Sequence, residues 1–184
     1  VGGPKGVGAL IAGPDYNPGG MSAMLRGGGQ ESGRRAGTEN VIGIAGFGAA
    51  CEAAARDLSN GIWEQVAELR NVLEKALEAG SKKTIFVGKD VERLPNTACF
   101  ITPGWRGDMQ VMQMDLAGFA ISAGSACSSG KVATSRVLTA MGFDDAEAAC
   151  AVRVSLGADT TEEHVLRFAD AWTAKLKKHE ARAA

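Results

Sequence analysis

The sequence of 184 residues predicts an α/β protein, and three observations support this. Apolar residues recur at helical spacing over residues 62–79, and Gly80 follows where a glycine commonly ends a helix. Short apolar segments at 84–87 and 97–102, bounded by prolines, are typical of strands. Further helical and strand-like stretches then alternate to the end of the chain, which indicates a mixed architecture.

The other elements follow in order along the chain. A short buried strand is expected over residues 7–12, and Thr38 is expected to cap a helix over residues 39–57. The pair Thr160 and Glu163 has the spacing of a capping box at the start of the last helix. The remaining predicted elements are a helix at 108–116, a strand at 119–122, an exposed loop at 123–135, a helix at 135–141, a strand at 150–156 and the last helix at 161–179.

Composition limits the partners of the chain. Lysine and arginine number 20 and aspartate and glutamate 21, so the net charge is −1. Without a basic excess, neither nucleic acid nor an anionic membrane is an expected partner. No apolar stretch approaches the roughly 18 residues that a membrane helix needs. The first residue is Val1 rather than Met, so we expect the chain to begin inside a longer gene product.

The four cysteines are Cys51, Cys99, Cys127 and Cys150. They form no C-x-x-C pair, so a zinc site is not expected. Nothing indicates secretion, which favours reduced thiols in the cytoplasm over disulfides. Cys127, within GSACSSG, has the most polar surroundings and is either a nucleophile or a free surface cysteine. The other three are expected to be buried packing residues.

Two further positions could bind anions. The glycine-rich residues 27–38 end at a predicted helix N-terminus, where backbone N–H groups and the Thr38 hydroxyl suit a phosphate, although an ordinary glycine-rich turn is an equal alternative. Arg153 lies in the apolar segment CAVRVSLG. It could form an ion pair with an acidic residue, or it could hold a substrate carboxylate. His164 and His179 are expected to be exposed on the last helix.

Four segments together resemble one family: GPKGVGAL (3–10), GGGQESGRRAGTEN (27–40), GSACSSGK (124–131) and VRVSLG (152–157). Their order resembles that of group I cysteine desulfurases, which are pyridoxal-phosphate enzymes of fold type I in the class V aminotransferase superfamily. The resemblance implies a cofactor, pyridoxal 5'-phosphate, and conversion of L-cysteine to L-alanine. It also implies that sulfur passes to an iron–sulfur scaffold or another acceptor protein.

The resemblance assigns roles to three residues. Cys127 matches the nucleophile that becomes a persulfide, and Arg153 matches the arginine that binds the substrate carboxylate. Thr38 matches a threonine that reaches the cofactor phosphate of the neighbouring subunit, which implies a homodimer. Two positions depart from the family pattern: Arg26 stands where many relatives have histidine, and Cys99 where many have asparagine.

The resemblance also implies that the chain is the C-terminal half of the enzyme. In the family, the lysine that forms the Schiff base lies upstream of GPKG, and Lys5 does not match it. We therefore expect residues 1–70 to be the end of the large cofactor domain, including part of its sheet and a linking helix. Residues 71–184 would be the small α+β domain, and this fragment alone would be inactive.

Two alternatives remain at this point. The parent protein could be another class V pyridoxal-phosphate enzyme, such as a selenocysteine lyase. The chain could instead be a non-catalytic sulfur-relay module, in which Cys127 accepts a persulfide from a donor enzyme.

Overall fold

The structure is a computed structural model that describes residues 2–11, 13, 22–124 and 135–183. It divides into two compact units, Val1–Asn60 and Gly61–Ala184, and each is described by itself. No helix in the described ranges is both long enough and apolar enough to cross a membrane.

The first unit contains a short 3₁₀ helix, η2 (Gln30–Gly33), and the helix α1 (Val41–Ser59). The N-cap of α1 is Asn40, whose side-chain Oδ1 accepts a hydrogen bond from the Gly43 N–H at 3.1 Å. The prediction that Thr38 caps this helix is therefore wrong, because the asparagine two positions later satisfies the same backbone donors.

The strand predicted over residues 7–12 is also wrong for the part that the structure describes. Residues 7–11 form no strand, and Leu10 and Ile11 are exposed. The neighbouring segment packs on a helix instead: Pro4 contacts α1 so closely that a β-carbon at Gly46 would overlap its ring. A strand needs a partner for its backbone groups, and the described residues of this unit provide none.

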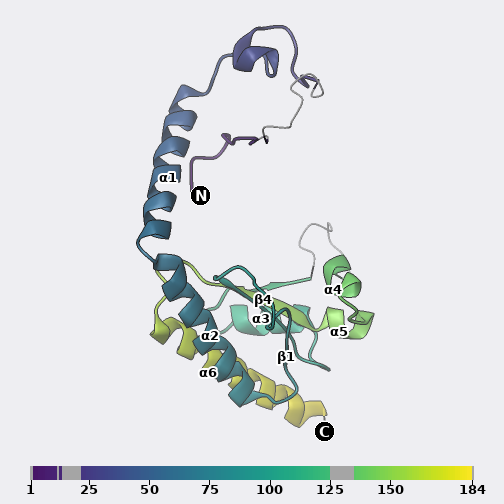
Figure 1. Ribbon diagram of the computed structural model, residues 1–184. Helices are drawn as coiled ribbons and strands as arrows, with labels where there is room; N and C mark the ends of the chain where they lie inside the picture. Colours follow the sequence, from purple (N-terminus) through teal and green to yellow (C-terminus); the bar gives the residue numbers. More distant parts are fainter. Residues whose placement is uncertain (1, 12, 14–21, 125–134, 184) are drawn as a thin grey trace. The chain divides into compact units, whose positions relative to one another are not determined.

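The second unit contains an antiparallel sheet in the order β1-β2-β4-β3 (Figure 1). Its strands are β1 (Ile85–Phe86), β2 (Thr97–Ile101), β3 (Ser122–Ala123) and β4 (Ala151–Ser155). The strands predicted at 84–87, 97–102 and 150–156 are confirmed, and the one predicted at 119–122 begins later. The helices of this unit are α2 (Ile62–Gly80), α3 (Gly107–Asp115), α4 (Arg136–Ala140), α5 (Asp145–Ala149) and α6 (Glu162–Ala183).

One face of the sheet forms the main core. Phe100, Val152 and Val154 project from this face and pack with residues of α2 and α6, which lie side by side in Figure 1. Trp172 of α6 packs edge-on against Phe100, with ring centroids 5.5 Å apart. Burial of these side chains is the main stabilising contribution to the second unit.

The helix predicted over 62–79 is confirmed, but the reason for Gly80 differs. Gly80 is the last residue within α2, and Ser81 is the C-cap. A β-carbon at Gly80 would overlap the Thr173 side chain of α6, so the glycine permits close packing of two helices.

The start of α6 also differs from its predicted capping box. Thr161 and His164 exchange hydrogen bonds, with each backbone N–H donating to the other's side chain at 3.3 Å. Thr160 instead accepts a hydrogen bond from the Gly157 N–H at 2.9 Å. Its hydroxyl therefore stabilises the preceding turn.

Among the described residues of the second unit, the opposite face of the sheet is covered at one end only. Ile101 and Ala151 pack there with Leu138, Ala148 and Cys150, which belong to α4, α5 and the residue after α5. The helix α5 was not predicted, because its five residues show no apolar period. It begins with a capping box in which Asp144 and Glu147 each bond the other's backbone N–H.

A buried glutamine connects three elements of this unit. Gln110 of α3 is fully buried, and its Oε1 accepts a hydrogen bond from the Trp172 indole N–H at 3.0 Å. Its Nε2 donates to the Trp105 carbonyl at 2.8 Å and to the Cys150 carbonyl at 3.2 Å. These bonds link α3 to α6 and to the residue that precedes β4.

Replacing Gln110 by methionine, which is similar in size, is expected to lower the free energy of unfolding by about 2–3 kcal/mol. The buried Trp172 N–H would lose its acceptor, and burying a polar group without a partner is costly. Denaturant unfolding followed by tryptophan fluorescence measures the loss. Gln65→Met, at an exposed position of α2, is the matched control. A loss no larger than that of the control would contradict the role given to Gln110.

Candidate active site

Where α4 and α5 no longer cover the second face of the sheet, a small polar surface remains. This open sheet face consists of Thr97, Cys99, Ser122, Arg153 and Ser155. Arg153 lies at its centre, because β4 pairs with β2 on one side and with β3 on the other. Cys99 is its partner in β2, and Ser122 is its partner in β3. Direct cross-strand partners share a face, so these three side chains form one row.

Arg153 is exposed and forms no ion pair with any acidic residue that the structure describes. The strand alternation explains how a charged residue fits into an apolar segment: Val152 and Val154 point into the core, and Arg153 points away from it. The structural ion pair considered from the sequence is thus not seen in the described residues. An exposed guanidinium without an ion-pair partner among the described residues is suited to bidentate binding of a carboxylate.

Cys99 belongs to this face, which the sequence did not indicate. It is half-buried, and this burial raises the pKa of its thiol, while the nearby positive charge of Arg153 acts in the opposite direction. The thiol is therefore neutral near pH 7 and cannot neutralise Arg153. Cys51 is also half-buried and Cys150 is buried, so complete burial, as predicted, holds for Cys150 alone.

Cys127 lies in segment 125–134, outside the described residues. In the sequence this segment follows β3 directly after Gly124, which has a positive φ of 59°. The last described strand before Cys127 is therefore the one that carries Ser122 next to Arg153.

Thr38 lies in the first unit, two residues before the N-cap of α1, and is exposed. The loop around it is held by Arg35, whose Nη1 donates to the Gly37 and Thr38 carbonyl oxygens. An exposed hydroxyl close to the positive end of a 19-residue helix is a suitable donor for one phosphate oxygen. Thr38 therefore fits one contact of the phosphate group of pyridoxal phosphate.

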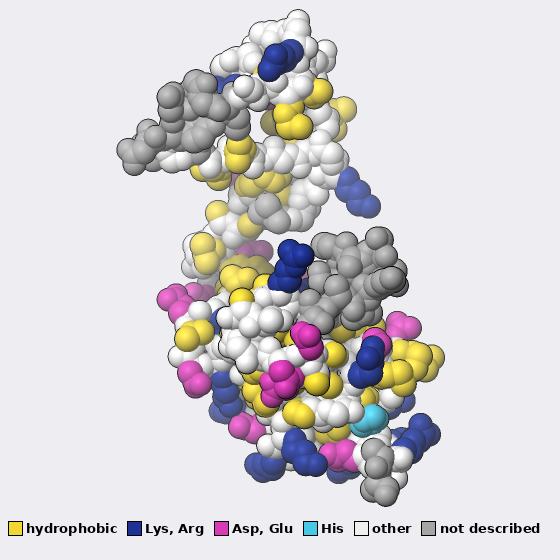
Figure 2. Space-filling model, turned by 90° about the vertical axis from the view of Figure 1, so that its right-hand side faces the viewer, with side chains coloured by type: hydrophobic (Ala, Val, Ile, Leu, Met, Phe, Trp, Pro, Cys, Tyr) yellow, Lys and Arg dark blue, Asp and Glu magenta, His cyan; other side chains and the backbone are white. Residues whose placement is uncertain are grey.

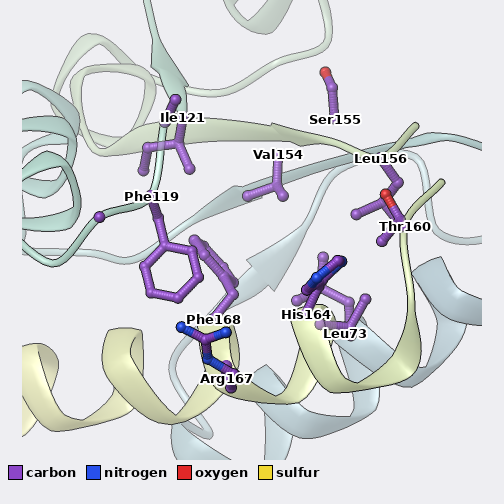
Figure 3. Close-up of a pocket in the computed structure, with 13 residues that line it drawn as sticks. Leu73, Phe119, Ile121, Val154, Ser155, Leu156, Thr160, His164, Arg167 and Phe168 are labelled. Atoms are coloured by element: carbon purple, nitrogen blue, oxygen red, sulfur yellow. The ribbon is translucent and has the colours of Figure 1, made fainter.

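A separate cavity of about 330 Å³ lies at the β3 edge of the second unit (Figure 3). Its apolar lining consists of Leu73, Phe119, Ala120, Ile121, Val154, Leu156, Val165 and Phe168. Ser155 and Thr160 also line it, and His164 and Arg167 extend from α6 beside it. The lining shares Ser155 with the open sheet face but does not include Cys99, Ser122 or Arg153, so the row around Arg153 lies outside this cavity.

A basic groove lies between α3 and α6 and has a volume of about 490 Å³. It is lined by Met109, Met112, Gln113, Lys175, Lys178, His179 and Arg182. No acidic residue in the described ranges forms an ion pair with its lysines or arginine. Figure 2 shows a histidine with basic, acidic and hydrophobic side chains around it on one face.

The two histidines differ in their surroundings. His164 is exposed, as predicted. His179 stacks on Trp105, with ring centroids 5.6 Å apart, and its Nε2 lies 3.0 Å from the Gly104 carbonyl oxygen. These contacts give His179 a structural role at the end of the groove.

Comparison with known protein families gives one match that spans most of the chain. The family described as aminotransferase class-V matches residues 1–168. A cysteine desulfurase of Sinorhizobium fredii is 41% identical over 180 residues, which are 96% of this chain and 44% of that protein. A cysteine desulfurase IscS of Clostridium botulinum is 39% identical over 165 residues, which are 89% of this chain and 41% of that protein. The chain thus spans about four-tenths of the length of these curated relatives.

Solved structures give the same fold. A NifS-like protein from Rickettsia africae superposes with a TM-score of 0.74 at 32% identity, covering 85% of this chain and 40% of that one. A second NifS-like protein superposes with a TM-score of 0.72 at 31% identity. The mixed helix and sheet architecture predicted from the sequence is confirmed.

The raised pKa of Cys99 predicts slow alkylation. At pH 8 a smaller fraction of this thiol than of an unperturbed thiol is ionised, so iodoacetamide should label it more slowly than a short cysteine peptide. The rate should keep rising with pH above the range in which the peptide reaches its plateau. Mass spectrometry of the Cys99 peptide, at several pH values, measures this. A midpoint at or below that of the peptide would contradict the assignment of a neutral thiol beside Arg153.

Proposed function

The chain belongs to the class V aminotransferase family, and from this premise we propose that its activity is that of a cysteine desulfurase. The observation that carries the proposal is the exposed guanidinium of Arg153, which has no ion-pair partner among the described residues. It lies on the open sheet face in β4, which pairs with β3, and β3 leads in sequence to Cys127. L-Cysteine offers a carboxylate for the first residue and a sulfur atom for the second. The names of the curated relatives support the same reaction.

In this proposal Arg153 holds the substrate and Cys127 takes the sulfur. The guanidinium binds the α-carboxylate through two N–H donors and so fixes the orientation of the amino acid. The thiolate of Cys127 attacks the substrate sulfur, the Cβ–S bond breaks, and Cβ gains a proton. The products are L-alanine and a persulfide on Cys127, so one thiol and one cysteine give one persulfide and one alanine.

Pyridoxal 5'-phosphate, on which enzymes of this family depend, acts as an electron sink when bound and so allows the Cβ–S bond to break. From this chain, Thr38 would donate its hydroxyl hydrogen to a phosphate oxygen. We propose that this phosphate belongs to the cofactor of a neighbouring subunit in a homodimer. Support comes from the exposure of Thr38 and from the helix N-terminus that follows it.

The persulfide sulfur then passes to an acceptor protein, and we propose an iron–sulfur scaffold as that acceptor. The basic groove between α3 and α6 would attract an acidic surface, and its two methionines would pack against apolar side chains. We further propose a cytoplasmic location. Support comes from Cys51, Cys99 and Cys150, which are free thiols in the described part of the chain, since a reducing compartment keeps thiols in this state.

Replacing Cys127 by alanine in the full-length, cofactor-loaded protein is expected to abolish persulfide formation, because no other thiol is assigned to the sulfur. Alanine production from L-cysteine in the presence of an acceptor should fall by about 100-fold or more. Mass spectrometry for an added sulfur atom, together with an alanine assay, tests this, and Cys51→Ala is the control. A persulfide on Cys127 that needs a separate donor enzyme, with no alanine formed, would instead favour a sulfur-relay module.

Replacing Arg153 by glutamine is expected to raise the KM for L-cysteine about 10- to 100-fold, because a charge-assisted contact with the carboxylate is lost. Arg167→Gln, which removes an exposed arginine of α6 away from the open sheet face, is the matched control and should leave the KM unchanged. Steady-state kinetics with both variants measures the KM for L-cysteine and so tests this role of Arg153. Equal KM values for Arg153→Gln and the unsubstituted protein would remove Arg153 from the site.

A further inference from the structure

We infer that the Ser122 hydroxyl is a second binding group for the substrate carboxylate, placed beside Arg153 by the pairing of β3 with β4. This inference rests on the proposed function, because it assigns another residue to the same contact. The supporting observation is the row formed by Cys99, Arg153 and Ser122. In this row Arg153 has a thiol on one side and a hydroxyl on the other.

The backbone fixes which way Ser122 points. Phe119, Ile121 and Ala123 all pack against the main core, so the alternation along this segment directs Ser122 to the opposite face. Arg153 projects from that same face, between the two core residues Val152 and Val154. The side chains of Ser122 and Arg153 are therefore neighbours.

Distance separates Ser122 from the other hydroxyls of the open sheet face. Side chains directly opposite across an antiparallel pair have β-carbons about 5 Å apart. Ser155 is two positions along β4 from Arg153, about 7 Å away, and Thr97 lies diagonally across at a similar or greater separation. Of the three hydroxyls, the one of Ser122 is thus closest to the base of the Arg153 side chain.

The chemistry of the two neighbours determines which side of Arg153 the carboxylate occupies. A hydroxyl can donate to a carboxylate oxygen and accept from a guanidinium N–H at the same time. The thiol of Cys99 is a weak donor and a weak acceptor, and its burial keeps it neutral. A carboxylate bound to Arg153 therefore gains a second strong partner on the β3 side and none on the β2 side.

Equilibrium binding tests this inference without turnover. L-Alanine, which keeps the carboxylate and has no thiol, is compared with L-alaninamide by calorimetry on the full-length, cofactor-loaded protein. Ser122→Ala is expected to weaken L-alanine binding about five-fold and to leave L-alaninamide binding unchanged. Ser122→Thr keeps the hydroxyl and should retain binding within two-fold of the original, as should Ser155→Ala, the matched control on the same face.

Each result bears on one claim. If Ser122→Ala weakens both ligands equally, or if Ser155→Ala has the same effect as Ser122→Ala, the inference is overturned. Ser122→Cys, which keeps the size and loses the strong donor, repeats the test if the alanine variant melts at a lower temperature, and it should behave as alanine does. If Arg153→Gln also leaves L-alanine binding unchanged, the carboxylate site itself is wrong and the proposed function fails with it.

Discussion

The pairing of β4 with two neighbours is the constraint on which the second unit depends. β4 is bonded to β2 over five residue pairs and to β3 over two, so its register is fixed from both sides. Because side chains alternate along a strand, a shift by one residue would turn Val152 and Val154 towards solvent and Arg153 into the core. Burying an unpaired guanidinium there would cost several kcal/mol, so the same register that builds the core also presents Arg153.

The two faces of the sheet differ: one forms the main core, and the other carries the candidate site. One face is covered by α2 and α6 and contains the aromatic core. In the described part of the second unit, the other face is covered by α4 and α5 only as far as Ile101 and Ala151. Gln110 connects these parts, because it bonds the carbonyl of Cys150, at the entry to β4, and the Trp172 indole of α6. The start of β4 is therefore held by buried hydrogen bonds, close to the point where its exposed arginine begins the open sheet face.

The sequence predicted those elements whose signal is local and strong. α2 has apolar residues on one helical face over five turns, and β2 and β4 alternate between apolar and small or polar residues. α5 has neither signal, since only its capping box defines it. Residues 7–11 have the apolar content of a strand, but a strand also needs a partner, and no local pattern supplies one. The cap of α1 was misplaced because Thr38 and Asn40 are both good N-caps and only the backbone geometry decides between them.

The site was partly predictable for the same reason. Arg153 could be identified because a charge within an apolar strand is unusual and needs an explanation. Cys99 and Ser122 could not be identified, because each lies next to Arg153 only through the pairing of its own strand with β4, which is far away in the sequence. From the sequence, Cys99 in particular is expected to be a core residue, whereas the strand register shows that it lies on the second face.

The exposure of Arg153 determines what this residue can select. Its guanidinium is exposed and forms no ion pair with the described residues, so binding a carboxylate would cost it water contacts and no ion pair to those residues. With neutral neighbours on both sides, its charge is available for an incoming anion. In the proposed function, Arg153 would therefore distinguish amino acids from thiols that lack a carboxylate, but it would be insensitive to the sulfur atom. Recognition of sulfur would then come from groups outside this row, so in this proposal the residues that bind the substrate and the residue that takes its sulfur act on different parts of the same substrate molecule.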